Sequence, residues 1–447
     1  MASSARSLEQ MIQNQSIVVG IIGMGYVGLP LALSFVEHKI KVIGFDIDPN
    51  KAKQLNDGHC YFRHMPPTCV SSAVSTGRFS ATTDFVSLRA ADALIICVPT
   101  PLTVQREPDL SYVESTARHI QKILRPGHLV ILESTTYPGT TDELLKGILD
   151  QTGLKCGTDY FLAFSPERED PGNKTHNTQS IPKVVGGVDK VSGDLAQMLY
   201  DQAIAKTVRV ASARTAEAVK LTENIFRAIN IALVNELKIT FDRMDINIWD
   251  VIEAASTKPF GFMRFNPGPG WGGHCIPLDP FYLAWKAREF GVRTKFIELA
   301  GEINTDMPHY VVNKLQLGLN ECGKAVRDSQ ILLIGMAYKK DIDDTRESPS
   351  LEIMRFLDNL GAKCSYHDPF VASVPSTRHS PHKSGLLSVP LDAASVAAFD
   401  AVVIVTDHTP VDYGLLARSA KLIVDARGVY DTVHRDLAPF IAKLIRA

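Results

Sequence analysis

The feature that most constrains the fold of this chain is a glycine-rich turn set between a strand-like run and a helical pattern. Gly23-Met24-Gly25-Tyr26-Val27-Gly28 follows the apolar run Ile17–Ile22, and Asp46 ends the next such run. Glycines at this spacing permit a tight turn and close approach of a pyrophosphate, which the N-terminus of the following helix favours electrostatically. An acid at the end of the second strand can hydrogen-bond the two hydroxyls of an adenosine ribose, which selects NAD over NADP. A glycine turn alone can be purely structural, but together with the strand, the helix and the acid it predicts an NAD site at Gly23, Gly25, Tyr26, Val27, Gly28 and Asp46.

Short apolar runs alternate with helical patterns up to about residue 205, and each run is unbroken by polar residues. They are Ile17–Ile22, Lys41–Phe45, Ala93–Val98, Leu129–Glu133, Tyr160–Phe164 and Lys183–Val185. Runs of this kind are typical of parallel strands buried on both faces, so they predict a doubly wound α/β domain. The loops that follow two of these strands lie where ligands bind in such sheets. Further cofactor contacts are therefore expected from Thr100, Ser134 and Thr135.

The rest of the chain divides into a helical segment and a second α/β segment. Residues 211–258 contain neither Gly nor Pro, which predicts one long helix, a break near 244–247 and a second helix. More helix is expected from Pro280 to about Leu319. After Lys324 the α/β pattern resumes with the runs Gln330–Gly335, Lys363–His367, Ala401–Thr406 and Lys421–Asp425. We therefore expect an α/β fold in which two Rossmann-like, doubly wound domains are joined by a central helical domain, with boundaries at 1–15 (N-terminal tail), 16–210, 211–323 and 324–447.

Composition excludes several classes of protein. The 447 residues carry a formal net charge of -2, which gives no reason to expect nucleic acid as a partner. The seven cysteines form no CxxC pair and no metal-like cluster, so we expect no metal and a cytoplasmic location. Residues 17–36 carry no charge and are long enough to span a bilayer, but four glycines and Pro30 divide them into strand, turn and helix. No membrane partner is expected.

A cysteine at position 275 is the strongest candidate for a catalytic nucleophile. It lies in Gly268–Pro280, among glycines that leave room for a substrate and prolines that restrict the loop. A free cysteine is more often a small buried residue, a description that Cys97 fits within its apolar run. To act as a nucleophile, Cys275 needs a nearby cation or helix dipole that favours the thiolate. Asp279 can serve as a base for water or merely cap the helix that follows.

Charged residues elsewhere suggest polar contacts to a substrate. Lys220 and Asn224 are four residues apart on the predicted long helix, so they share a face and can donate to an oxyanion, although a solvated helix face is the alternative. Glu167 follows a strand and can position water or a sugar, or be a surface acid. Lys339 and Arg346 follow the first strand of the last domain and can bind a diphosphate, unless the neighbouring acids neutralise them.

In this order, the motifs resemble the conserved blocks of the UDP-glucose/GDP-mannose dehydrogenase family, from about residue 16 to 435. The matching blocks are Gly-Met-Gly-Tyr-Val-Gly-Leu-Pro, Ser-Pro-Glu-Arg, the helix with Lys220 and Asn224, Gly-Gly-His-Cys-Ile-Pro and Lys-Lys-Asp…Asp-Thr-Arg-Glu-Ser. The resemblance implies an NAD-binding lobe at 16–210, a helical dimerisation domain with the cysteine loop at 211–323, and a UDP-sugar-binding lobe at 324–447. It also implies a homodimer or higher oligomer.

The resemblance further implies a two-step, four-electron oxidation of a nucleotide sugar at C6, in a pathway to surface polysaccharide. Cys275 would add to the C6 aldehyde, a second NAD would take hydride to leave a thioester, and water would release the acid. Lys220 and Asn224 would stabilise the oxyanion, and Asp279 would assist water. Thr135 and Glu167 would place water or substrate, and Arg346 would lie near cofactor or substrate. Substrate contacts are expected from Glu167, Arg168, Lys220, Asn224, Arg264, Phe265, Gly272 and Lys339.

One departure from the family pattern bears on the substrate. Members that oxidise UDP-glucose usually carry Lys before the aspartate of the cysteine loop, whereas this chain has Leu278. That form is similar to members that act on UDP-N-acetylhexosamines. The stretches Phe265–Gly270 and Trp285–Glu289 favour the glucosamine epimer, with UDP-N-acetyl-D-mannosamine and UDP-glucose as alternatives. An epimerase that keeps its NAD would need a Tyr–Lys pair inside the first domain, and the two Tyr-x-x-x-Lys matches lie outside it.

Overall fold

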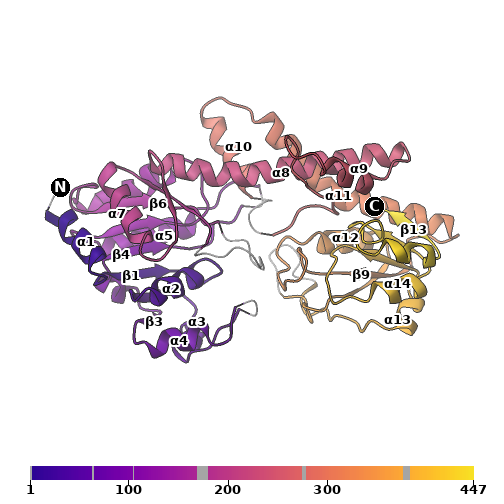
Figure 1. Cartoon of the computed structure of the whole chain (residues 1–447), viewed down its shortest axis with the longest axis horizontal. Coiled ribbons are helices and arrows are strands. Elements are labelled where there is room, and N and C mark those ends of the chain that lie inside the picture. The colour runs from indigo at the N-terminus through magenta and orange to yellow at the C-terminus, as the bar shows by residue number, and fades with distance from the viewer. Residues whose placement is uncertain (1–2, 63–64, 104, 169–179, 274–277, 376–382) are drawn as a thin grey trace. The chain divides into compact units, whose positions relative to one another are not determined.

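The computed structural model describes residues 3–62, 65–103, 105–168, 180–273, 278–375 and 383–447 (Figure 1). The chain forms two compact units. The first unit comprises residues 1–223 and 281–292, and the second comprises residues 224–280 and 293–447. Each unit contains a sheet of mostly parallel strands.

The sheet of the first unit has the strand order β3-β2-β1-β4-β5-β6-β7-β8. Its strands are β1 Val18–Ile22, β2 Lys41–Phe45, β3 Phe79–Thr82, β4 Ala93–Ile96, β5 Leu129–Leu132, β6 Phe161–Phe164, β7 Lys183–Gly187 and β8 Thr207–Arg209. Each of the six predicted runs coincides or overlaps with one strand, so the doubly wound fold class is confirmed. The strand order reverses between β1 and β4, and ligands bind at such a switch point, beyond the carboxyl ends of the strands.

One pairing in this sheet differs from the predicted parallel pattern. β6 and β7 run antiparallel, with Ala163 opposite Gly187 and Phe164 opposite Gly186. Antiparallel neighbours need no helical crossover, and the described residues between Ser165 and Pro182 contain no helix. Because β7 is buried along its whole length, its apolar character does not reveal its direction.

Helices of the first unit include one that sequence reasoning missed. Before residue 213, the described helices are α1 Ser3–Gln13, α2 Gly28–Glu37, α3 Pro49–Asn56, α4 Cys69–Ser75, α5 Ser111–Ile123, α6 Lys146–Leu149 and α7 Lys190–Tyr200, with short turns of helix at Phe85–Ala90, Thr140–Leu145 and Asp150–Thr152. In α1, the apolar residues Ala5, Leu8 and Ile12 recur at helical spacing and are fully buried. They share a core with alternate strand residues such as Val19 and Ile21. Residues 3–13 thus form a helix that packs into the core of this unit, although their polar composition had suggested only a tail.

In the predicted helical segment, the described residues form the helices α8 Ala213–Arg243, α9 Ile248–Ala255, α10 Asp279–Glu289 and α11 Lys295–Glu321. The predicted break near 244–247 is confirmed. Asp245 adopts a left-handed backbone with φ of 57°, which ends a helix. The Asn247 side chain then caps α9 by accepting a hydrogen bond of 3.0 Å from the backbone N–H of Trp249.

The second unit contains a five-stranded parallel sheet in the order β10-β9-β11-β12-β13. Its strands are β9 Gln330–Ile334, β10 Lys363–His367, β11 Ala401–Ile404, β12 Ile423–Asp425 and β13 Leu444–Arg446, and its other helices are α12 Pro349–Asn359, α13 Ala393–Ala398, α14 Tyr413–Ser419 and the short turn Arg435–Phe440. Leu333 and Val403 pack on one face with residues of α11 and α12. Leu332 and Val402 face α13 and α14 on the other (Figure 1). The sheet therefore has helices on both faces, as the unbroken apolar runs predicted.

No helix in the described part of the chain is both long enough and apolar enough to cross a membrane.

Candidate functional site

The glycine turn of the first unit has the geometry that a dinucleotide requires. Gly23 has a left-handed backbone with φ of +100°, and a Cβ placed on it would lie 2.5 Å from the carbonyl oxygen of Cys97. A Cβ on Gly28 would lie 1.9 Å from the carbonyl oxygen of Gly23. Around Gly25, by contrast, a Cβ would meet no atom within 4 Å. The turn is thus closed toward the protein and open on the side where a phosphate approaches the N-terminus of α2.

Asp46 lies at the end of β2, beside this turn. Its Oδ2 accepts a hydrogen bond of 3.1 Å from the backbone N–H of Met24, and its Oδ1 accepts one of 3.0 Å from Asp48. Nζ of Lys51 lies 3.3 Å from Oδ2. These contacts hold the carboxylate in place and leave it acceptor capacity for a ribose hydroxyl. Near the turn, the rings of Tyr26 and Phe62 lie 4.4 Å apart.

The loops after β4 and β5 are tied together on the same edge of the sheet. Ser134 Oγ donates a hydrogen bond of 2.7 Å to the carbonyl oxygen of Val98. The carbonyl oxygen of Thr100 accepts one of 2.9 Å from the Tyr282 hydroxyl. Thr135, the next residue after Ser134, is half-buried. Ser134 and Thr100 therefore shape the edge as well as being candidates for cofactor contacts.

Behind these loops lies a buried ionic cluster that sequence reasoning missed. Nζ of Lys183 is 2.5 Å from Oε1 of Glu133, which also accepts a hydrogen bond of 2.7 Å from the Tyr200 hydroxyl. Burial raises the pKa of Glu133, and the Lys183 ammonium opposes that shift. Burial also raises the pKa of the Cys97 thiol well above its usual value, which agrees with its expected role as a small packed residue. No spacing rule links residues 133, 183 and 200, so no signal in the sequence predicts their contact.

Lys220 does not lie on a solvated helix face. It is only 7% exposed, and its Nζ donates a hydrogen bond of 2.5 Å to the backbone oxygen of Glu167. The next residue, Arg168, forms an ion pair with Glu223 and donates a hydrogen bond of 2.7 Å to the backbone oxygen of Pro182. The turn with Glu167 and Arg168 is thus held against the start of α8.

Asn224 and Asp279 meet inside the second unit. Nδ2 of Asn224 donates a hydrogen bond of 2.5 Å to Oδ2 of Asp279, and the two residues are 6% and 1% exposed. Asp279 begins α10, four residues after Cys275. Cys275 itself lies outside the described residues. The structure therefore places the proposed oxyanion donor against the proposed base.

The glycines before Cys275 lie close to a loop of the sheet in the second unit. A Cβ on Gly272 would lie 2.6 Å from Cβ of Tyr338, and the backbone N–H of Gly273 donates a hydrogen bond of 3.0 Å to the carbonyl oxygen of Arg346. Further upstream, Phe265 packs on Phe226 with ring centroids 6.0 Å apart. Arg264 is exposed and hydrogen-bonds Asn266 at 3.2 Å.

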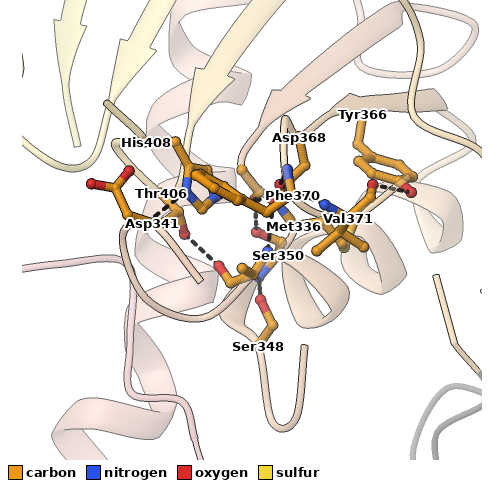
Figure 2. Close-up of polar contacts among 12 residues, drawn as sticks. Met336, Asp341, Ser348, Ser350, Tyr366, Asp368, Phe370, Val371, Thr406 and His408 are labelled. Carbon is orange, nitrogen blue, oxygen red and sulfur yellow. Dashed lines mark hydrogen bonds and ion pairs between the residues drawn. The ribbon is translucent and has the colours of Figure 1, made fainter. Parts of the chain in front are cut away.

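That loop leaves β9 in the same way as the glycine turn leaves β1. Gly335 donates its backbone N–H to the oxygen of His367 at 2.9 Å, as Gly23 does to Phe45 at 2.8 Å. Met336 then donates its backbone N–H to Oδ2 of Asp368 at 2.6 Å, as Met24 does to Asp46. Figure 2 shows Asp368 surrounded by this loop, Phe370 and His408. Burial by itself would raise the pKa of Asp368, but hydrogen bonds from His408 and backbone amides hold it at about 2.

Basic residues gather at the carboxyl edge of this second sheet. Lys339 is half-buried in the loop after β9, and Arg346 forms an ion pair with Asp344 at 2.6 Å. Arg346 thus belongs to the second unit and is partly neutralised by a neighbouring acid. Arg427 follows β12, and its Nε donates a hydrogen bond of 3.1 Å to Asp407. Sequence reasoning missed Arg427, although its place directly after a predicted strand was a usable signal.

Comparisons with known proteins agree with this arrangement. Residues 16–204, 214–306 and 332–432 match the models of the NAD binding, central and UDP binding domains of the UDP-glucose/GDP-mannose dehydrogenase family. The chain is 34% identical to a UDP-N-acetyl-D-mannosamine dehydrogenase of Pyrococcus horikoshii, over 92% of this chain and 95% of the relative. It is 35% identical to a UDP-N-acetyl-D-glucosamine 6-dehydrogenase of Pseudomonas aeruginosa, over 88% and 91%. A solved UDP-glucose dehydrogenase from Pyrobaculum islandicum superposes with a TM-score of 0.84, at 27% identity and with 96% of each chain covered.

Proposed function

We propose that this chain, which belongs to the UDP-glucose/GDP-mannose dehydrogenase family, oxidises C6 of UDP-N-acetyl-D-glucosamine to a carboxylate. It is an NAD-dependent UDP-sugar dehydrogenase, and the proposal concerns which sugar it uses and which residues act. Leu278 before Asp279 favours an N-acetylhexosamine over glucose. The relatives named for the glucosamine and the mannosamine epimer are about equally similar to this chain, so UDP-N-acetyl-D-mannosamine is the alternative.

The observation that carries the proposed chemistry is the buried hydrogen bond between Asn224 and Asp279. It fixes an amide donor against a carboxylate that follows Cys275 by four residues in the sequence. An amide can stabilise a developing oxyanion, and a carboxylate can accept a proton from water. A nucleophilic thiol with such neighbours can form and hydrolyse an acyl intermediate.

The residues of the first unit would hold NAD, which when bound accepts hydride in both oxidation steps. The glycine turn and the N-terminus of α2 would bind its pyrophosphate, and Asp46 its ribose. Thr100, Ser134 and Thr135 line the same edge of the sheet. Each contribution is binding and orientation, because the chemistry of hydride transfer belongs to the cofactor.

In the proposed reaction, the Cys275 thiolate adds to the C6 aldehyde and forms a C–S bond while the carbonyl oxygen becomes an oxyanion. Lys220 and Asn224 donate hydrogen bonds to that oxygen. Loss of hydride from C6 leaves a thioester, and water, deprotonated by Asp279, then displaces the thiolate and yields the carboxylate. Before these steps, the C6 alcohol loses a hydride and a proton and becomes the aldehyde. The sugar therefore loses four electrons in total, and one water molecule supplies the second oxygen of the acid. Glu167 would orient the water or the sugar.

The second unit would hold the nucleotide. Lys339 and Arg427 lie at the carboxyl edge of its parallel sheet, where two cations can pair with a diphosphate. Phe265, Arg264 and Gly272 belong to the segment that leads into the cysteine loop and would contact the sugar or base.

We further propose a homodimer or higher oligomer that acts in the cytoplasm, in the synthesis of a surface polysaccharide. Exposed large apolar side chains on two long helices support self-association. Phe226 and Leu233 on α8 are 50% and 52% exposed, and Phe296 on α11 is 69% exposed. Two of these lie seven residues apart and so share a helix face.

The test is NADH production by the purified protein with UDP-N-acetyl-D-glucosamine, UDP-N-acetyl-D-mannosamine, UDP-glucose and GDP-mannose side by side. We expect the highest kcat/KM with UDP-N-acetyl-D-glucosamine, two NADH per sugar consumed and no free aldehyde. A preference for another sugar would replace the proposed substrate. One NADH per sugar would remove the thioester step.

A further inference from the structure

The loop after β9 is held in place by contacts with residues outside it. It runs from Gly335 to Ser348 and includes Lys339. Within it, Asp341 has a left-handed backbone with φ of 60°, and so does Glu347 with φ of 49°. Few residues other than glycine adopt this conformation, although Asp tolerates it better than most. The contacts of Asp341 with residues outside the loop therefore contribute to where the loop lies.

Residues after β11 provide those contacts. Nδ1 of His408 accepts a hydrogen bond of 3.0 Å from the backbone N–H of Asp341. The backbone N–H and the hydroxyl of Thr409 donate to the two carboxylate oxygens of Asp341 at 2.8 and 2.7 Å. Thr406 Oγ1 donates to the carbonyl oxygen of Ala337 at 2.6 Å. Figure 2 shows His408 and Thr406 next to Asp341.

His408 is itself held in one orientation and one tautomer. Because Nδ1 accepts a hydrogen from an amide, the ring hydrogen must be on Nε2. Nε2 lies 3.0 Å from Oδ2 of Asp368, which is ionised and therefore accepts that hydrogen. The ring is fully buried, and its centroid lies 5.1 Å from that of Phe370. Asp368 also accepts the backbone N–H groups of Met336 and Ala337, at the start of the same loop.

The far end of the loop touches the glycines that lead to Cys275. Gly273 donates its backbone N–H to Arg346, and Tyr338 packs directly against Gly272. A shift of the loop would therefore displace both Lys339 and the residues just before the thiol.

We infer that His408 is a positioning residue, which holds the loop of Lys339 through the N–H of Asp341 and thereby fixes the nucleotide contact relative to the cysteine loop. The inference rests on the proposed function in one respect, namely that Lys339 binds the nucleotide. His408 touches no reacting atom. It acts through Asp341.

Two substitutions separate the two hydrogen bonds of the ring. His408→Asn places a carbonyl oxygen near the position of Nδ1, so it can still accept the N–H of Asp341. His408→Gln places an amide near the position of Nε2, so it can still donate to Asp368 but leaves Asp341 without an acceptor. His309→Gln is the matched control, because His309 is an exposed histidine of the same unit.

We expect His408→Gln to raise KM for the UDP-sugar and Kd for UDP by about tenfold, as expected for one lost hydrogen bond in a binding loop, with KM for NAD unchanged. His408→Asn should stay within about threefold of the unmodified protein in both quantities. The rate at which iodoacetamide alkylates Cys275 should change in the Gln variant and not in the Asn variant. His309→Gln should match the unmodified protein throughout.

Equal behaviour of the Asn and Gln variants, whether both intact or both impaired, would overturn the inference, since a purely structural histidine does not distinguish them. If neither variant folds, Thr409→Val removes the hydroxyl that donates to the Asp341 carboxylate. An unchanged Kd for UDP would then overturn the premise of the inference, that contacts of Asp341 set the position of Lys339. Kd for UDP does not depend on which sugar is oxidised. A protein that binds UDP but oxidises none of the four sugars would refute the proposed function and leave this test valid.

Discussion

Asn224 Nδ2 and Asp279 Oδ2 lie 2.5 Å apart, in a contact from which solvent is almost entirely excluded. The two residues are separated by 55 positions in the chain, on α8 and at the first residue of α10. Because each orients the other, we expect their substitutions to be strongly non-additive. In a double-mutant cycle with Asn224→Ala and Asp279→Ala, the coupling in kcat should be about 1–3 kcal/mol. Additive effects on kcat would show that the two residues act independently.

Lys220→Met should lower kcat by about a hundredfold or more, because it removes one donor to the oxyanion. Binding of NAD, measured by fluorescence titration, should change little. Lys190→Met on the exposed surface of α7 is the matched control and should leave kcat unchanged. A Lys220 variant with reduced NAD binding and normal kcat would assign this residue to the cofactor instead.

Cys275→Ser should block net formation of the acid, since a hydroxyl is a poor substitute for a thiolate nucleophile at neutral pH. Affinity for UDP should be retained. The control is Cys322→Ser, at an exposed cysteine of the second unit. Uronate production by the Cys275 variant, detected by mass spectrometry, would move the nucleophile elsewhere.

Asp46→Ala should raise KM for NAD by about tenfold, because the carboxylate no longer binds the ribose hydroxyls. In the unmodified protein, Nζ of Lys51 lies 3.3 Å from Oδ2 of Asp46. Without that carboxylate, the ammonium of Lys51 would be available to pair with the 2′-phosphate of NADP. Steady-state rates should therefore show relatively better use of NADP. An unchanged ratio of kcat/KM for the two cofactors would contradict the assignment.

Lys238 makes stability depend on pH in the alkaline range. Its Nζ is buried and has no hydrogen-bond partner among the described residues. Burial lowers the pKa of Lys238 from 10.5 to about 8, and the nearby Asp425 opposes that shift only in part. Between pH 8 and pH 10.5, Lys238 binds a proton in the unfolded chain but not in the folded protein. The free energy of unfolding should therefore increase as the pH is raised from about 8 to about 10.5.

Lys238→Met should remove that rise and stabilise the protein at pH 7 by roughly 1–3 kcal/mol, provided that the side chain serves only packing. Urea titrations at several pH values measure both effects. Lys41→Met, at an exposed lysine, should leave the pH profile unchanged. A destabilised Lys238 variant would indicate that the ammonium has a partner that stabilises its charge.

Much of the architecture could be predicted because apolar runs and helix breakers are local signals. Each predicted run coincides or overlaps with a strand, and the break after α8 falls at the predicted residues. The strands β3, β8 and β13 were missed because they are short and all three are partly exposed. The direction of β7 was missed because burial does not encode direction.

The site was less predictable for a related reason. Spacing identifies which residues end a strand or share a helix face, and so it indicated Asp46, Lys220 and Asn224. It does not identify which distant side chains meet. The contacts of Lys183 with Glu133 and of His408 with Asp368 depend on how strands are ordered in the sheet, and no spacing in the chain records that order.

The acid at the end of the second strand occurs twice in this protein, as Asp46 and as Asp368. A carboxylate has about four lone-pair positions, and Asp368 accepts from His408 and from the amides of Met336, Ala337, Phe370 and Val371. Asp368 therefore has no acceptor position left for a sugar hydroxyl. A search for a strand, a tight turn and a following acid would therefore find two dinucleotide sites in this chain. Of the two acids, however, only Asp46 can still accept a hydrogen bond from a ribose hydroxyl.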